Sequence, residues 1–143
     1  MDRLSRMHSA EHILTAVMQR KFGSLRNLEM HLGEKKSKCD YAVPQVLTQD
    51  DVAAIEEAVN AEIEKDQPIT VQMLPIEEAR QRYDLWKVPE KATTIRIVKI
   101  GDLDANPCAG EHVNNTRQIG RFRVKSIDMK DEGIVRIRFT IEN

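Results

Sequence analysis

The chain has 143 residues with a net charge of -1, and 41% of its residues are hydrophobic and 31% are charged. This length suits one domain with a buried core, and the near-zero charge excludes a general polyanion binder, which carries a clear excess of lysine and arginine. The chain has no apolar run long enough to span a membrane and no apolar secretory signal at its start. It contains two cysteines. We therefore expect a cytoplasmic protein with reduced thiols and no membrane or DNA partner.

The first predicted element is a helix over residues 4–22, where apolar side chains recur with helical spacing and Gly23 stands at the C-terminal cap. Residues 28–43 predict two short strands around the polar turn Gly33-Glu-Lys-Lys-Ser37. Pro44 is expected to end the second strand, because proline cannot donate to a sheet ladder. This segment therefore predicts a hairpin with a basic tip.

A second helix is predicted from Thr48 to about residue 65, because the acidic residues after Thr48 suit the positive end of a helix dipole. We expect its apolar positions to form one broad buried stripe, consisting of Val52, Ala53, Ile55, Ala58, Val59, Ala61 and Ile63. The glutamates expected to face water are Glu56, Glu57, Glu62 and Glu64.

Shorter elements follow in the middle of the chain. Residues 69–74 predict a strand, a short helix begins at Pro75, and residues 93–100 alternate as a second strand. The piece from Trp86 to Pro89 between them is expected to be irregular. No internal repeat appears in this region or elsewhere.

The last third predicts two strands, 119–127 and 135–141, in which cations alternate with apolar residues. If they pair as a hairpin, five cations share one sheet face, namely Arg121, Arg123, Lys125, Arg136 and Arg138. The alternative is a solvated face balanced by nearby acids, namely Asp128, Asp131 and Glu132. Together the elements predict a single-domain α+β fold, with a mostly antiparallel sheet and helices packed on one face.

Two motifs nearly a hundred residues apart are the most informative part of the sequence: His8-Ser-Ala-Glu-His12 and Cys108-Ala-Gly-Glu-His112. Each places two zinc-type ligands four residues apart, a spacing that puts both on one side of a helix. The second motif follows Asn106-Pro107, a turn signal, so we expect it at a loop or helix start folded over the first helix. Zinc prefers four Cys and His ligands, so the sequence predicts one Zn²⁺ site.

The first motif also matches the inverted zinc-peptidase signature, in which the glutamate serves as general base. That class would use a downstream carboxylate as third ligand, which leaves Cys108 and His112 unexplained. The residues are compatible with two further functions. The zinc could be structural in a binding module for tRNA or another partner, or the chain could be a metal-dependent hydrolase of small esters or peptides.

Three segments together resemble the editing domain shared by alanyl- and threonyl-tRNA synthetases. They are residues 6–14, the run from Cys108 to Gly120, and the closing Gly133-Ile-Val-Arg-Ile137. The resemblance extends over the whole chain, 1–143, which contains nothing that could serve as an aminoacylation domain. It therefore implies a free-standing alanyl-tRNA editing protein that acts in trans.

The resemblance implies hydrolysis of the ester that joins a wrong amino acid, serine or glycine, to the 3′ end of alanine tRNA. It also implies that the family's zinc ligands correspond to His8, His12, Cys108 and His112. Glu34 falls in a loop where the family often has a glutamine near the substrate, and Asp40 falls where the family has an acidic residue on the following strand.

The chain departs from the family where alanine-specific members usually have threonine before each second histidine, since here these residues are Glu11 and Glu111. With Glu34, three carboxylates are then expected to converge on one metal-centred pocket, where at least one could act as a proton acceptor near neutral pH. The competing interpretations are that Glu11 faces solvent and that Glu111 hydrogen-bonds a ligand imidazole.

The partner implied is the acceptor end of a mischarged tRNA. We expect its phosphates to contact Lys35, Lys36, Lys38, Arg121, Arg123 and Arg136. His31 and Cys39 are spare ligand candidates that we expect to be strand residues with packing or edge roles. The sequence leaves both a monomer and a homodimer open.

Overall fold

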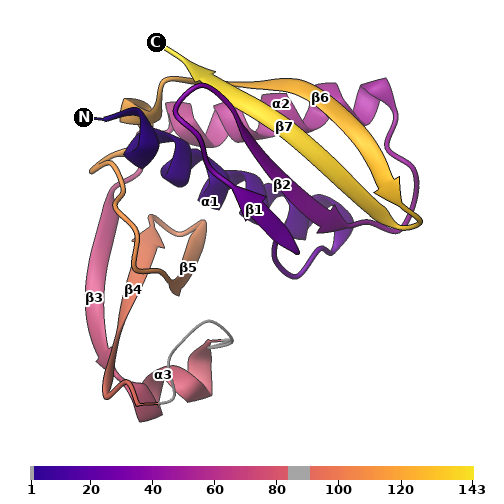
Figure 1. Cartoon of the computed structure of the whole chain (residues 1–143). Helices are drawn as coiled ribbons and strands as arrows, with labels where there is room; N and C mark the ends of the chain where they lie inside the picture. The colour runs from indigo at the N-terminus through magenta and orange to yellow at the C-terminus, as the bar shows by residue number, and fades with distance from the viewer. Residues whose placement is uncertain (1, 84–90) are drawn as a thin grey trace.

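The computed structural model describes residues 2–83 and 91–143 (Figure 1). Its elements, in chain order, are α1 (Arg3–Phe22), β1 (Glu29–His31), β2 (Ser37–Ala42), α2 (Gln49–Glu64), β3 (Ile69–Pro75), α3 (Ile76–Arg82), β4 (Thr94–Ile100), β5 (Asp104–Pro107), the 3₁₀ helix η1 (Thr116–Ile119), β6 (Arg121–Asp131) and β7 (Ile134–Glu142). The expected irregular piece from Trp86 to Pro89 lies outside the described residues. Within the described ranges, no helix combines the length and apolarity needed to cross a membrane.

The main core lies between a four-stranded antiparallel sheet, in the order β1-β2-β7-β6, and the helices α1 and α2 on one of its faces (Figure 1). The sheet buries Tyr41 on β2 and Ile137 and Phe139 on β7 against these helices. The opposite face carries charged side chains, because successive residues of a strand point to opposite sides. The predicted α+β class with helices on one face of an antiparallel sheet is confirmed.

Helix α1 begins and ends where its capping residues predict. The side chain of Asp2 accepts a hydrogen bond from the amide of Ser5 at 2.8 Å. At the other end Gly23 has φ 72°, and its amide donates to the carbonyl oxygen of Gln19 at 3.0 Å. A residue with a side chain adopts that left-handed conformation less readily, so glycine ends the helix here. The expected helix over 4–22 is confirmed.

Helix α2 begins with a capping box in which Thr48 and Asp51 each accept a hydrogen bond from the other's backbone amide. Its apolar stripe is narrower than expected, since Ala53 and Ala61 are exposed. The expectation that Glu62 faces water is wrong. Its buried carboxylate accepts hydrogen bonds from Lys65 and Gln67, both at 2.8 Å, and so fixes the path of the chain as it leaves the helix.

A second, three-stranded antiparallel sheet in the order β3-β4-β5 extends away from the first and carries α3 at its far end (Figure 1). It has a small core of its own, made of Leu74, Ala79, Ile95 and Ile97. The predicted strands over 69–74 and 93–100 and the helix after Pro75 are confirmed. Strand β5 was not expected, and it directly precedes Cys108.

Strands β6 and β7 form the expected antiparallel hairpin. A register shift between Val124 and Ser126 reverses the alternation of β6, so Lys125 has no partner position in β7 and the expected row of five cations is interrupted. The outer face also carries acids, since Arg138 forms an ion pair with Asp128. The interpretation of this face as balanced by acids is therefore closer to what the structure shows.

Candidate metal centre and substrate pocket

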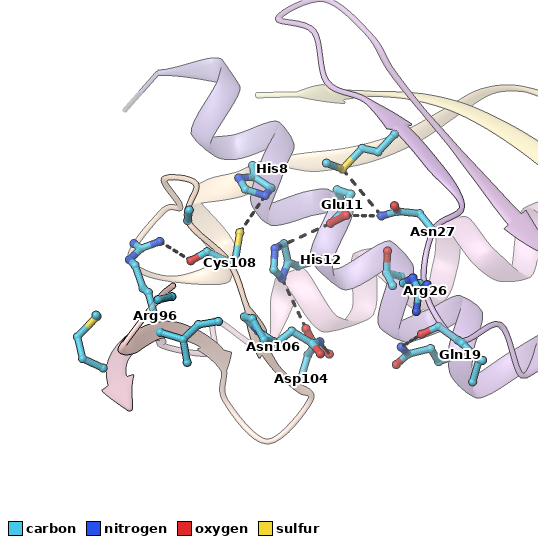
Figure 2. Close-up of a pocket in the computed structure, with 18 of the residues that line it drawn as sticks. His8, Glu11, His12, Gln19, Arg26, Asn27, Arg96, Asp104, Asn106 and Cys108 are labelled. Carbon is cyan, nitrogen blue, oxygen red and sulfur yellow. Dashed lines mark hydrogen bonds and ion pairs between the residues drawn. The ribbon is translucent and has the colours of Figure 1, made fainter. Parts of the chain in front are cut away.

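Four side chains from two separate segments, α1 and the loop between β5 and η1, meet in one cluster. His8 and His12 lie one turn apart on that helix, Cys108 follows β5, and His112 lies in the loop before η1. One ligand-type atom of each lies within 4.8 Å of all the others. The Sγ atom of Cys108 is 3.3 Å from Nε2 of His8 and 3.8 Å from Nε2 of His112 (Figure 2 shows His8, His12 and Cys108).

The second motif lies in a loop, one of the two placements expected, and Arg96 on β4 holds this loop in place. The amide of Cys108 donates to the carbonyl oxygen of Arg96 at 3.1 Å, and the guanidinium of Arg96 donates to the carbonyl oxygens of Cys108 and Gly110 at 3.0 and 2.6 Å. Gly110 passes so close to the imidazole of His8 that a Cβ atom there would overlap the ring. A side chain at position 110 would force the His8 ring to move, so glycine lets the loop close over α1 without disturbing it.

Neighbouring groups shift the pKa values of two members of the cluster in opposite directions. Burial lowers the pKa of His12, but the carboxylates of Glu11 and Asp104 outweigh it and raise that pKa to about 10. Burial raises the pKa of the Cys108 thiol, but the three neighbouring imidazoles outweigh it and lower that pKa to about 3. Cys108 is thus a thiolate at neutral pH, and a cation binding here would have to displace a proton from His12.

The donor set fits a zinc ion. One thiolate and three imidazoles are ligands that zinc prefers, and four of them complete its usual tetrahedral shell. The Nδ1 atom of His112 is buried without a hydrogen-bond partner among the described residues. Buried polar atoms normally have a bonding partner, so this nitrogen requires one from outside the described residues.

His8, His12 and Cys108 of this cluster line a cavity of about 840 Å³ between α1, the segment after α1, β4 and β5 (Figure 2). Its polar lining includes His8, Glu11, His12, Asn27, Asp104 and Cys108. Its apolar lining includes Leu25, Met30, Met73, Ile95 and Pro107. A ligand bound in this cavity would contact both the Cys and His side chains of the cluster and apolar side chains.

Glu11 is a buried carboxylate that lines this pocket. Its exposed fraction is 6%, its Oε1 accepts a hydrogen bond from Nδ2 of Asn27 at 2.7 Å, and its Oε2 lies 4.0 Å from Nε2 of His12 (Figure 2). Burial raises the pKa of Glu11, while the neighbouring histidines oppose that rise. The interpretation in which Glu11 faces solvent is wrong, because the side chain points into the cavity.

Comparison with known proteins identifies relatives of this chain. Residues 95–138 match the family model described as the threonyl and alanyl tRNA synthetase second additional domain. The chain is 36% identical over 138 residues to the alanyl-tRNA editing protein AlaX-L of Pyrococcus horikoshii, an alignment that covers 94% of this chain and 33% of that protein. This chain is homologous to an alanyl-tRNA editing protein. The expected resemblance to alanyl-tRNA editing proteins is confirmed.

The same homology extends to larger enzymes. The chain is 28% identical over 138 residues to the alanine–tRNA ligase of Treponema denticola, covering 95% of this chain and 23% of that enzyme. It is 30% identical over 132 residues to the ligase of Petrotoga mobilis, covering 91% of this chain and 15% of that enzyme. This editing-protein homologue therefore spans a third or less of the length of these relatives.

The three carboxylates expected to converge do not do so in this homologue of the editing protein. Glu34 is exposed at the hairpin tip, where its carbonyl oxygen accepts a hydrogen bond from Nε of Arg3 at 2.7 Å. Glu111 is also exposed, and neither side chain lines the pocket in the described structure. The expected convergence of Glu11, Glu34 and Glu111 is wrong, because only Glu11 lines the described pocket while the other two are exposed to solvent. Asp104 is the second carboxylate at the pocket.

Four of the cations expected to contact tRNA keep exposed or half-exposed side chains. Lys35 and Lys36 are exposed at the tip of the β1–β2 hairpin, Lys38 is half-buried at the start of β2, and Arg121 is exposed at the start of β6. None of them is among the residues that line the described pocket. A tRNA bound at the pocket would have to extend across the surface to reach them.

The other two cations are held by acids. Arg123 pairs with Glu142 at 3.1 Å. Arg136 donates to Asp40 at 2.8 and 3.0 Å and lies 3.2 Å from Glu29. Asp40 thus faces the outer side of the sheet rather than the pocket, and the guanidinium of Arg136 holds the pKa of that carboxyl below its usual value of 3.8.

The spare ligand candidates take the strand roles expected of them. His31 is exposed on β1, and Cys39 is fully buried in the main core on β2. Neither cysteine of the chain is in a disulfide.

Sequence reasoning missed Asn27, Arg96 and Asp104, all of which line the pocket. Asn106 was seen only as a turn residue, although its side chain donates to Asp104 at 2.6 Å. One signal was available: an acidic residue four positions before Cys108 is a candidate partner for a ligand imidazole. The sequence does not show which imidazole it reaches.

Proposed function

We propose that this chain hydrolyses the ester bond of mischarged alanine tRNA, removing serine and also glycine from its 3′ end. The names of the relatives, one an alanyl-tRNA editing protein and the others alanine–tRNA ligases, support the substrate class. In this proposal residues 1–143 form one editing-type domain that acts on the acceptor end of a tRNA supplied by another enzyme. The substrate would put the chain in the cytoplasm.

One observation carries the proposal: a buried carboxylate, Glu11, lines the same cavity as three of the four side chains in the Cys/His cluster, His8, His12 and Cys108. A carboxylate shielded from water and not neutralised by a lysine or arginine among its described contacts is suited to accept a proton. The same cavity offers apolar surface for the rest of the substrate.

In the proposed site His8, His12, Cys108 and His112 hold Zn²⁺. When bound, zinc supplies Lewis acidity toward the ester carbonyl, or an anchor for the substrate's amino group. Four protein ligands usually mark a closed structural site, so the proposal requires a further coordination position or a loosely held ligand.

The chain's own residues perform the proton transfers. Glu11 accepts a proton from a water molecule as the water oxygen attacks the ester carbonyl carbon, and Asn27 orients the carboxylate through its hydrogen bond at 2.7 Å. The bond between the carbonyl carbon and the ribose oxygen then breaks. The proton returns from Glu11 to that oxygen, which leaves the free amino acid and the 3′-terminal hydroxyl of the tRNA.

The exposed cations of the hairpin tip, Lys35 and Lys36, together with Lys38 and Arg121, are the proposed phosphate contacts. Arg123 and Arg136 are weaker candidates, because carboxylates already neutralise them. The proposal therefore restricts the tRNA contact to fewer cations than the sequence predicts.

The test is deacylation by the zinc-loaded chain of alanine tRNA charged with serine, glycine or alanine. We expect release of serine and glycine, retention of alanine, and loss of activity in His12→Ala. A Lys35→Ala, Lys36→Ala double variant should raise KM and leave kcat unchanged. Intact serine- and glycine-charged tRNA would refute the proposal.

A second candidate, a tRNA-binding module whose zinc is purely structural, is favoured by the complete set of four protein ligands. The same assay separates the two functions, since tight binding of charged tRNA without release of the amino acid supports the module. Activity on free aminoacyl esters that equals activity on charged tRNA would instead favour a small-ester hydrolase.

A further inference from the structure

Asp104 connects the second sheet to a proposed zinc ligand on α1. It is the first residue of β5, and its Oδ2 lies 3.6 Å from Nδ1 of His12, with 8% of each side chain exposed (Figure 2). Its other oxygen, Oδ1, accepts a hydrogen bond from Nδ2 of Asn106 at 2.6 Å. Neither Asp104 nor Asn106 belongs to the two ligand motifs.

The two nitrogens of the His12 ring have different surroundings. Nδ1 faces Asp104 at 3.6 Å, whereas Nε2 faces the pocket, where Oε2 of Glu11 lies 4.0 Å away. A neutral imidazole carries its proton on one nitrogen and a lone pair on the other. A carboxylate next to Nδ1 favours the proton there, and this leaves the lone pair of Nε2 available to a metal.

His12 is the most buried of the three histidines in the cluster. It is 7% exposed, and it borders the pocket on the same side as Glu11, so its ring angle decides where a metal ion would lie relative to that carboxylate. His112 differs, because its buried Nδ1 has no partner among the described residues. A carboxylate thus lies beside the second nitrogen of His12 but not beside that of His112.

We propose that Asp104, held by Asn106, is a positioning residue that fixes the ring of His12 with Nε2 directed toward the metal. The proposal rests on the zinc site of the proposed function and adds a residue that lies outside both motifs. Ligand imidazoles usually donate their second N–H to a carboxylate or carbonyl, and removal of that partner typically lowers metal affinity by about 10- to 100-fold. Because Asp104 is on β5, the contact also ties the second sheet to α1.

The test measures zinc affinity by competition with a chelator, together with the absorption spectrum of the cobalt-substituted chain. Asp104→Ala should weaken zinc binding by about 10- to 100-fold and alter the cobalt bands. Asp104→Asn should lie between wild type and Asp104→Ala, because its amide oxygen can take the same place beside Nδ1 but carries no negative charge. Asp102→Asn, a change at an exposed residue of the preceding turn, is the matched control and should leave both readouts unchanged.

Asn106 provides a second, independent variant. Asn106→Ala should weaken zinc binding less than Asp104→Ala, and it should have little further effect when Asp104 is already alanine, because it acts through Asp104. Additive effects of the two changes would contradict this order of action.

Three results would decide the proposal. Unchanged zinc affinity and cobalt spectrum in Asp104→Ala would refute it. An Asp104→Ala variant whose Tm falls by the same amount in chelator and in zinc would also refute it. Asp104 would then stabilise the fold and not the metal site. Zinc binding that weakens as expected in Asp104→Ala, while the wild-type protein deacylates no charged tRNA, would support the positioning role and refute the editing function.

Discussion

Glu11 is the residue whose surroundings most constrain the chemistry of the pocket. It is buried beside His12, it accepts a hydrogen bond from Asn27, and it stands one position before a proposed metal ligand. A helical residue at that position points about 100° away from the ligand. It lines the cavity here together with Asn27, which lies in the segment after α1.

Replacing this carboxylate by its amide tests its role. We expect Glu11→Gln to lower the deacylation rate by about 10²- to 10⁴-fold, the usual contribution of a general base, with zinc affinity retained. Because burial raises the pKa of Glu11, the wild-type rate should fall as the pH drops through that raised pKa, and this acid limb should vanish in the variant. Glu57→Gln, at an exposed residue of α2, is the control. A variant as active as the wild type, with the same pH profile, would exclude Glu11 as the proton acceptor.

Among the elements, the cross-strand contact between β2 and β7 stabilises the outer face of the main sheet. Asp40 and Arg136 occupy paired positions on these strands, and the guanidinium donates two hydrogen bonds to the carboxylate. The folded pKa of Asp40 is lowered, so this pair contributes stability above the carboxyl's unfolded pKa. That contribution is lost as the pH falls through the lowered folded pKa.

Arg136→Met should therefore lower the free energy of unfolding near neutral pH, measured by urea denaturation. The difference from wild type should shrink as the pH falls through the lowered pKa of Asp40, because the carboxyl then becomes protonated in both proteins. Arg121→Met, at an exposed residue of β6, should have a much smaller effect at both ends of this pH range. An Arg136→Met deficit that is independent of pH would show that the guanidinium acts through packing rather than charge.

Elements with local signals were predictable from the sequence, and those set by distant contacts were not. Gly23 and Thr48 mark helix ends because their effects act within one turn. Strand β5 is four residues long and ends in proline, so only its pairing with β4 makes it a strand. The register shift after Val124 depends likewise on β7. Among site residues the ligand set was visible in two motifs, whereas the contact of Asp104 with His12 joins residues 92 positions apart.

At the scale of the molecule, the proposed zinc ion would join α1 to the loop that follows the second sheet. His8 and His12 belong to the helix against the main sheet, whereas Cys108 follows the second sheet. The second sheet has a small core of its own, but Ile69 of β3 and Val98 and Ile100 of β4 are buried in the main core, so the proposed ion would add to that burial in holding the sheet in place.

Zinc should accordingly stabilise the whole chain. A ligand that binds only the folded state adds about 2.7 kcal/mol when its free concentration is about 100 times its dissociation constant, so the Tm should rise with zinc concentration. His12→Ala should abolish most of this rise, whereas His31→Ala, at an exposed residue of β1, should preserve it. A Tm insensitive to zinc in the wild-type chain would argue against the metal site.

The most direct test of a zinc-centred editing pocket is the rate at which the zinc-loaded chain releases serine from serine-charged alanine tRNA. The account predicts that serine is released while correctly charged alanine tRNA stays intact, and that His12→Ala and Glu11→Gln both lose this activity. Serine-charged tRNA that remains intact with zinc-loaded, folded protein would contradict it.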